Sequence, residues 1–196
     1  MSTALRHDVP HHMTVDEFLD WASGAPGKWQ LVDGEPRAMA PASATHGIIQ
    51  AYFAYVLNRH LINGGSSCAV VTEPAVVPQI RAHSNMRVPD LAVTCAIVQA
   101  GQVAVQEPVL LVEILSPSNE ADTRQNVWAY ASIPSVREIL ILHSTRIAAE
   151  LLRRRPDASW PEEPHPVGPA DQLTLESIGL TVLLAELYAR THLARA

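Results

Sequence analysis

The stretch that most constrains the fold of this chain is PVLLVEILSPS, residues 108–118, where apolar residues fill most positions around one acid, Glu113. A strand with one face in water alternates apolar and polar residues, whereas a near-continuous apolar run is typical of a strand covered on both faces. The stretch therefore predicts a buried strand with other elements packed on both of its sides.

Capping signals and periodicity predict the helices. TVDEF carries a capping box, with Thr14 as the N-cap and Glu17 at the third helical position, so we expect a helix to begin there. Over residues 44–61, apolar residues recur at helical spacing, and the NGG that follows is typical of a helix end. Further helices are expected over 119–131 and 184–196.

The remaining regular segments resemble strands. WQLVDGEPRAMA, residues 29–40, alternates apolar and polar residues about a DG turn, which predicts a hairpin. The Pro-rich, acidic segment 155–172 predicts a surface loop rather than a linker between domains. Further strands are expected over 68–78, 87–95, 136–143 and 147–154, the last two paired with each other.

Length and composition indicate one domain. The 196 residues, 47% hydrophobic and 17% charged, suit one folded unit with a sizeable core. We expect a flexible leader over residues 1–12 and a single domain over 13–196. No apolar run approaches the roughly 20 residues that span a membrane, and the N-terminus lacks the apolar core of a secretory signal. A cytoplasmic protein with no membrane partner is therefore expected.

Charge and cysteine usage limit the partners. A net charge of −6 argues against binding nucleic acid by bulk attraction, so any DNA contact must be weak or local, or helped by a metal ion. Of the 14 basic residues only Lys28 is a lysine. Cys68 and Cys95 lack metal-ligand spacing, and we interpret them as small buried apolar residues.

Two acids interrupt predicted strands: Asp90 in RVPDLAVTC, residues 87–95, and Glu113 in the apolar run. A buried carboxylate costs several kcal/mol unless it is paired, hydrogen-bonded or bound to a metal. Oxygen ligands on adjacent strands suit Mg²⁺, which takes one or two protein carboxylates and keeps several waters. Three plainer explanations stay open: Asp90 sits in a turn after Pro89, Glu113 pairs with an arginine, or either acid lies at a solvent-facing edge.

PDLAV and VEILSPS, with an acid at the start of one strand and another inside the next, resemble the PD-(D/E)xK nuclease superfamily. The wider pattern is similar to one branch of it, the Uma-two-type restriction endonucleases of bacteria. That resemblance covers residues 14–189 and implies an α/β, restriction-endonuclease-like core with a central mixed β-sheet flanked by helices. It also implies hydrolysis of phosphodiester bonds with Mg²⁺ or Mn²⁺. The other segments that carry it are TVDEFLDW, LVDGEPRAMAPASATH, WAYASIPSVREILIL and SIGLTVLLAELY.

The resemblance assigns roles to named residues. Asp90 and Glu113 would be metal ligands, together with the backbone carbonyl of Ile114. Glu35 would be a further acid near the metal, and His46 would face the site from the start of the long helix. From the residues alone, Glu35 beside a hairpin turn is more often solvated, and His46 in a first helical turn more often makes a local hydrogen bond.

The pattern departs from the superfamily at its lysine, which normally lies two residues after the acid. Leu115 occupies that position, and the branch supplies its lysine from the following helix, where the matching residue here is Asn126. Arg124 lies about 200° away around that helix, so it reaches the same place only if the backbone bends. The Arg-rich, Lys-poor composition also suggests a bias against lysine across the whole chain, which would remove surface lysines without any bearing on this position.

Two hypotheses follow. The first is a metal-dependent endonuclease acting on DNA, impaired because Asn126 stands in the place of the lysine. The second is a catalytically inactive homodimer that serves as a binding or regulatory module; homodimerisation itself is expected from the resemblance and from the symmetry of duplex DNA. We also interpret Trp128 and Tyr130 as core residues. Residues 153–155 are interpreted as exposed arginines that guard a sheet edge against pairing with another chain.

Overall fold

A six-stranded mixed sheet forms the centre of the computed structural model, which describes residues 12–117 and 119–195. Its only parallel neighbours in this part of the chain are β5 and β6, and the remaining pairs are antiparallel. This arrangement confirms the predicted mixed sheet. The strands in spatial order are β3 (Ala69–Thr72), β4 (Leu91–Thr94), β5 (Pro108–Leu115), β6 (Glu138–His143), β7 (Ala149–Arg153) and β8 (His165–Val167).

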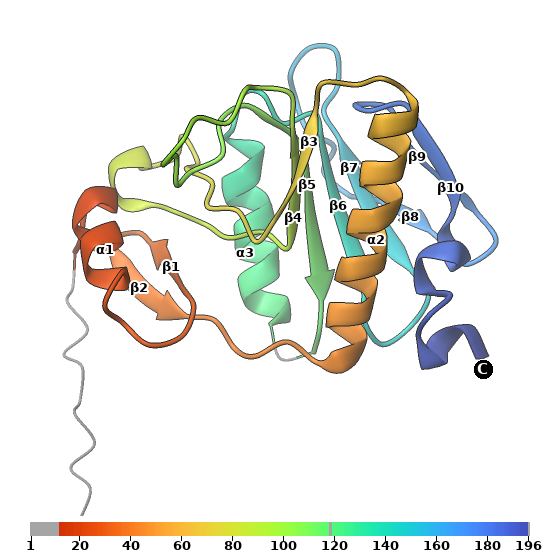
Figure 1. Ribbon diagram of the computed structural model, residues 1–196, viewed down its shortest axis with the longest axis horizontal. Helices are drawn as coiled ribbons and strands as arrows, with labels where there is room; N and C mark the ends of the chain where they lie inside the picture. The colour runs from red at the N-terminus through yellow and green to blue at the C-terminus, as the bar shows by residue number, and fades with distance from the viewer. Residues whose placement is uncertain (1–11, 118, 196) are drawn as a thin grey trace, which may run out of the picture.

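Two helices cover the opposite faces of this sheet, α2 (Ala44–Asn63) and α3 (Glu120–Ala131) (Figure 1). Successive residues of a strand point to opposite faces. Accordingly Val112 and Ile114 join the cluster packed under α2, while Leu111 and Leu115 join the cluster packed under α3. The central strand β5 is therefore covered on both faces, as its apolar run predicts. None of the helices in the described ranges is long and apolar enough to cross a membrane.

A smaller lobe packs beside the sheet and has its own apolar cluster, to which Phe18 and Leu31 belong. The predicted capping box is present, since the Thr14 backbone N–H donates to Glu17 Oε2 over 2.8 Å and the Thr14 side chain accepts from the Glu17 N–H. Leu31 and Met86 exchange two backbone hydrogen bonds, which fix the hairpin against the segment that leads into β4. The lobe comprises α1 (Val15–Ala22), β1 (Trp29–Val32), β2 (Glu35–Ala38) and the 3₁₀ helix η1 (Ala82–Ser84).

The C-terminal region differs from the prediction. Residues 172–183 form a second hairpin, and residues 184–195 form two 3₁₀ helices in place of the expected α-helix. No side chain caps the first of these, and the Tyr188 hydroxyl fixes the turn by donating to the carbonyls of His143 and Ala148. The predicted surface loop over 155–172 contains the edge strand β8. The hairpin strands are β9 (Gln172–Leu175) and β10 (Leu180–Leu183), followed by η2 (Leu184–Tyr188) and η3 (His192–Arg195).

Two further expectations concern the cysteines and the leader. Cys68 and Cys95 form a disulfide, so their interpretation as separate buried apolar residues is wrong. The register explains the pairing, because Ala69 lies opposite Thr94 and the next two positions are the cysteines. The predicted leader over 1–12 falls outside the described residues except for its last position.

Candidate active site

The sheet register brings the two strand acids together. β4 begins at Leu91, which lies opposite Val112 of β5, so Asp90 directly precedes β4 at the end of the pairing where Glu113 follows Val112. Both acids are shielded from water: Glu113 is 5% exposed and the Asp90 side chain 13% exposed. Two carboxylates therefore share one end of the β4–β5 pair.

Asp90 is held by two donors from different elements. Its Oδ2 accepts the backbone N–H of Ile114 over 2.6 Å, and its Oδ1 lies 2.8 Å from Nε2 of His46. His46 occupies the first turn of α2, where the N-cap Ser43 accepts its backbone N–H and sets the start of the helix. The cap and the sheet together fix the direction of the Asp90 carboxylate.

Glu113 points to the opposite face of the sheet, toward α3. The Tyr130 hydroxyl donates to Glu113 Oε1 over 2.6 Å, and Nδ2 of Asn126 lies 3.4 Å from the same oxygen. Burial, and then the negative charge of Asp90, raise the pKa of the Glu113 carboxyl from 4.5 to about 8, although both hydrogen bonds oppose the shift. At neutral pH the protein without a cation therefore keeps Glu113 largely protonated.

Tyr130 and Asn126 lie four residues apart on α3, so one helical face carries both of them to Glu113. Tyr130 is fully buried, which agrees with its predicted place in the core, but its hydroxyl belongs to the site. The matching prediction for Trp128 is wrong, since that side chain is 66% exposed. The helical spacing from Asn126 was a signal in the sequence that could have assigned Tyr130 to the site.

Gln30 of β1 is a member of the site that the sequence analysis missed. Nδ2 of Asn126 lies 3.4 Å from Gln30 Oε1, and both side chains are buried. Oδ1 of Asn126 is also buried and has no hydrogen-bond partner in the described structure. A polar residue inside the otherwise apolar WQLV was the available signal, the same signal that drew attention to Asp90 and Glu113.

Glu35 does not join this group. It lies on β2 with about half of its side chain exposed, and within residues 12–117 and 119–195 its ion-pair partner is Arg37, at 3.8 Å. No hydrogen bond or ion pair in those residues links it to Asp90, His46 or Glu113. The hairpin therefore turns Gln30, and not Glu35, toward the acids.

The basic residues considered in place of the lysine are engaged elsewhere. Arg124 forms an ion pair with Glu150 of β7, and Lys28 with Glu73. Leu115 packs in the apolar cluster under α3. Asn126 thus occupies the position beside Glu113 with an uncharged amide.

The donors around the acid pair suit a hard cation. In the described residues no group of three or more His, Cys, Asp or Glu side chains converges as a complete metal cage. Two carboxylates, the unpartnered Oδ1 of Asn126 and a nearby backbone carbonyl are nevertheless all oxygen donors, the kind that Mg²⁺ binds while keeping several waters. This donor set is consistent with a divalent cation shared with a phosphate ligand.

The end of the β4–β5 pairing determines where the carbonyl of Ile114 points. The pairing of β5 with β4 ends at Val112, opposite Leu91, so no backbone pair of β4 lies beside Ile114. A strand residue directs its N–H and C=O to the same edge, and the Ile114 N–H already reaches the Asp90 carboxylate. The Ile114 carbonyl therefore faces the edge at which Asp90 lies, where the strand pairing ends.

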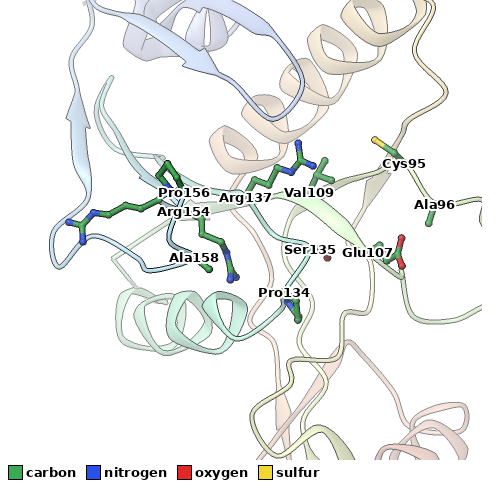
Figure 2. Close-up of a pocket in the computed structure, with 11 residues that line it drawn as sticks. Cys95, Ala96, Glu107, Val109, Pro134, Ser135, Arg137, Arg154, Pro156 and Ala158 are labelled. Atoms are coloured by element: carbon green, nitrogen blue, oxygen red, sulfur yellow. The ribbon is translucent and has the colours of Figure 1, made fainter.

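A separate cavity of about 440 Å³ opens at the other end of β5, where Val109 and Arg137 line it (Figure 2). Arg154 lies on one side of this cavity, and its guanidinium donates to three backbone carbonyls. Arg153 pairs with the buried Glu138, so of residues 153–155 only Arg155 is exposed. The prediction of an exposed arginine guard is wrong for the other two, which tie β7 to its neighbours.

A mixed sheet between helices, with an acid pair across two of its central strands, defines an α/β fold of the restriction-endonuclease-like class. The chain belongs to the Uma2 family, whose model, described as "Putative restriction endonuclease", matches residues 15–185. This finding confirms the resemblance inferred from the sequence motifs.

Two proteins are similar to this chain, one in structure and one in sequence. A protein of Anabaena variabilis, described as "a putative nuclease belonging to DUF820", has a crystal structure that superposes with a TM-score of 0.72 at 16% identity, over 90% of this chain and 98% of that chain. The "Uncharacterized protein slr1290" of a Synechocystis species is 29% identical over 178 residues, which is 90% of this chain and 91% of that protein. The first shows the same fold, and the second extends the similarity along most of both chains.

Proposed function

We propose that this protein is a metal-dependent endonuclease that hydrolyses DNA phosphodiester bonds at the site formed by Asp90 and Glu113. The single observation that carries the proposal is that the Asp90 carboxylate accepts the backbone N–H of Ile114, the residue next to Glu113, at the end of the β4–β5 pairing. Membership of the Uma2 family supports the nuclease class of the reaction. Metal ion, substrate and residue roles are part of the proposal.

The proposed ligands of Mg²⁺ or Mn²⁺ are the carboxylates of Asp90 and Glu113 and the carbonyl of Ile114. A divalent ion, when bound, supplies a Lewis acid for the phosphoryl oxygen and favours ionised water at neutral pH. The raised pKa of Glu113 supports a cation at this place, because a positive charge would offset both the burial of this carboxylate and the negative charge of Asp90.

The chain's own residues prepare the site. His46 and the Ile114 N–H orient Asp90, so that its carboxylate does not rotate toward solvent. The Tyr130 hydroxyl holds one oxygen of Glu113 and leaves the other to face a ligand. Binding of a cation requires Glu113 to release its proton, so we expect affinity for the ion to rise with pH up to about 8.

The absence of a lysine lowers the expected rate. A lysine ammonium beside the acid would stabilise the charge that develops on the phosphoryl group, and Asn126 has no charge to offer. The amide of Asn126 lies 3.4 Å from Glu113 Oε1, at the distance limit of a useful hydrogen bond. We therefore expect slow cleavage that depends on the metal ion alone.

The substrate and assembly are proposed on the same grounds. DNA contact is expected to be local, because the chain carries a net charge of −6. A homodimer acting in the cytoplasm would match the two-fold symmetry of duplex DNA. Glu35, which lies exposed on β2, would contribute to the site only through water or through movement of the hairpin.

A second candidate function is a catalytically inactive homodimer that binds a partner or nucleic acid without cutting it. The observation that favours it is the pair of buried amides, Gln30 and Asn126, beside Glu113. The side chains that contact Glu113 from α3 are a phenol and an amide, and the amide is backed by that of Gln30, so none of the three supplies a general base or a positive charge.

Nicking of supercoiled plasmid in Mn²⁺ separates these functions. The unmodified protein, Glu113→Gln and Asn126→Lys are compared, with Glu162→Gln on an exposed loop as the control for lost charge. Slow nicking that Glu113→Gln abolishes and Glu162→Gln preserves would establish a lysine-independent nuclease. Nicking by Asn126→Lys alone would show that the site is inactive because it lacks a lysine at position 126. Failure of every variant to cut would leave the binding module as the better account.

A further inference from the structure

Arg87 is a buried cation that the proposed function does not use. It lies three residues before Asp90 and is 5% exposed, and its backbone pairs with Val76 in an isolated bridge. Arginine is almost never buried in this way unless it is paired, because a charge out of water needs compensation. A buried Arg87 therefore needs hydrogen-bond acceptors, and preferably a negative charge, around its guanidinium.

The guanidinium is poorly compensated. Its Nη2 donates to the side-chain oxygen of Asn85 over 3.1 Å, and that oxygen is neutral and already accepts the Asp33 backbone N–H. Its Nε is buried without any hydrogen-bond partner. Across residues 12–117 and 119–195 no hydrogen bond engages Nη1, and no carboxylate comes within ion-pair distance of Arg87. A buried polar group left in this state calls for an absent ligand or water.

The surroundings of Arg87 place it near Tyr130, the residue that holds Glu113, and near a second cation. Burial lowers the pKa of Arg87, and so does the charge of Arg37 on β2, while Tyr130, Asp33 and Asp122 oppose them. Asp33 itself forms its ion pair with Arg81 and not with Arg87. Tyr130 is the residue whose hydroxyl donates to Glu113. Arg87 thus lies between the hairpin and α3, next to the residues that hold Glu113, with a like charge close by.

An anion is the ligand that satisfies these observations. It would offer acceptors to Nε and Nη1, neutralise the buried charge and separate Arg87 from Arg37. A phosphate group fits best, because the planar guanidinium presents parallel N–H groups that match two phosphate oxygens. A carboxylate ligand would also match these parallel N–H groups. The proposed cation site at Asp90 and Glu113 favours a ligand that binds a divalent cation through its oxygens as well, as a phosphate group does.

We propose that Arg87 binds a phosphate group of the nucleic acid backbone next to the acid pair, with Arg37 at the rim of the same site. The proposal rests on the proposed function for the identity of its ligand and extends it by naming the residue that holds the substrate's charge. Arg87 then supplies, from the segment before β4, a positive charge that neither Asn126 nor Leu115 provides.

The test measures anion binding without metal and without turnover, so its result is independent of whether the protein cuts DNA. Thermal unfolding is followed in EDTA over a titration of inorganic phosphate, with chloride added to keep the ionic strength constant. The unmodified protein is compared with Arg87→Met, which has a similar shape and no charge, and with Arg87→Lys. Arg137→Gln, which removes an equal charge from the cavity in Figure 2, is the matched control.

We expect phosphate to raise the unfolding midpoint of the unmodified protein and of Arg137→Gln, and to leave Arg87→Met at the small rise that phosphate causes in any protein. Without phosphate, Arg87→Met should unfold at a higher temperature than the unmodified protein, because an uncompensated buried charge is gone. In Arg87→Lys phosphate should raise the unfolding midpoint less than in the unmodified protein, since lysine keeps the charge and lacks the parallel N–H groups of the guanidinium.

Four results would overturn the proposal. A lower midpoint for Arg87→Met without phosphate, together with no specific response of the unmodified protein, would make Arg87 a structural residue. A response that persists in Arg87→Met and disappears in Arg137→Gln would move the anion to the cavity in Figure 2. No response in any variant would show that no phosphate binds. A thymidine dinucleotide replaces phosphate in a second titration, and a response to phosphate alone would remove nucleic acid as the ligand.

Discussion

The raised pKa of Glu113 makes a specific prediction about stability. In the folded protein this carboxyl titrates at about 8, whereas in the unfolded chain it returns to about 4.5. Between these pH values the folded state binds one more proton than the unfolded state, so the free energy of unfolding falls as pH rises. The contribution of Glu113 is most favourable below pH 4.5, is lost progressively up to pH 8 and stays lost above it.

The size of the effect follows from the same two values. One pH unit of protonation difference corresponds to about 1.4 kcal/mol, so the interval from 4.5 to about 8 costs the folded protein about 5 kcal/mol, of which about 4 kcal/mol falls between pH 5 and pH 9. Glu113→Gln keeps an oxygen that accepts the Tyr130 hydroxyl and removes the titration. The variant should therefore match the unmodified protein near pH 5 and exceed it by about 4 kcal/mol near pH 9.

Urea unfolding at steps from pH 5 to pH 9 measures this difference directly. Histidines and other groups titrate in the same interval, but they do so in both proteins and cancel in the difference between them. Glu162→Gln, at an exposed position, controls for the loss of one negative charge. A difference between Glu113→Gln and the unmodified protein that stays flat across the interval would refute the claim that Glu113 carries an extra proton in the folded state.

Three further substitutions test the neighbouring contacts by urea unfolding. Tyr130→Phe removes the 2.6 Å hydrogen bond to Glu113 and should cost about 1–3 kcal/mol above pH 8, where the carboxylate is charged. Asn126→Leu should be neutral or stabilising, within about 1 kcal/mol, because the amide makes only two long hydrogen bonds and buries an unpartnered oxygen; a loss above about 2 kcal/mol would mean that the amide is needed. Glu138→Gln should cost about 3 kcal/mol at neutral pH, because Arg153 loses its charged partner and Ser177 loses acceptors; an unchanged midpoint in urea would contradict the hydrogen bonds assigned to it.

The sequence predicted most of the central sheet and its covering helices, because each carries a strong periodic signal. The apolar run of β5 implied cover on both faces, and capping residues defined where α1 and α2 begin. The prediction of an α-helix in the C-terminal part was wrong for a physical reason. The turns of η2 are held by Tyr188 through the carbonyls of His143 and Ala148, distant residues that no local pattern reveals. The disulfide likewise depends on the register between β3 and β4.

The site was only partly predictable. Asp90 and Glu113 stood out because a carboxylate in an apolar strand needs a partner, and the sheet register brings them to one edge. Gln30 carried a weaker form of the same signal and was missed, since an amide in a strand costs less than an acid and draws less attention. Arg87 carried no signal at all, because its burial arises from the hairpin and α3 closing around it in three dimensions.

Glu113 and Glu138 show why burial alone does not identify a functional acid. Both lie on central strands and both are buried, yet Glu138 accepts hydrogen bonds from Arg153, from the backbone N–H groups of residues 176 and 177 and from the Ser177 hydroxyl. Its charge is compensated, so it stabilises the fold. Glu113 receives one short hydrogen bond from a phenol and faces a second acid instead of a cation. The two Glu→Gln substitutions should therefore change stability in opposite directions above pH 8. Because removal of the Glu113 charge is expected to strengthen the fold, folding does not explain this acid, whereas the oxygen donors around it support the divalent cation proposed above.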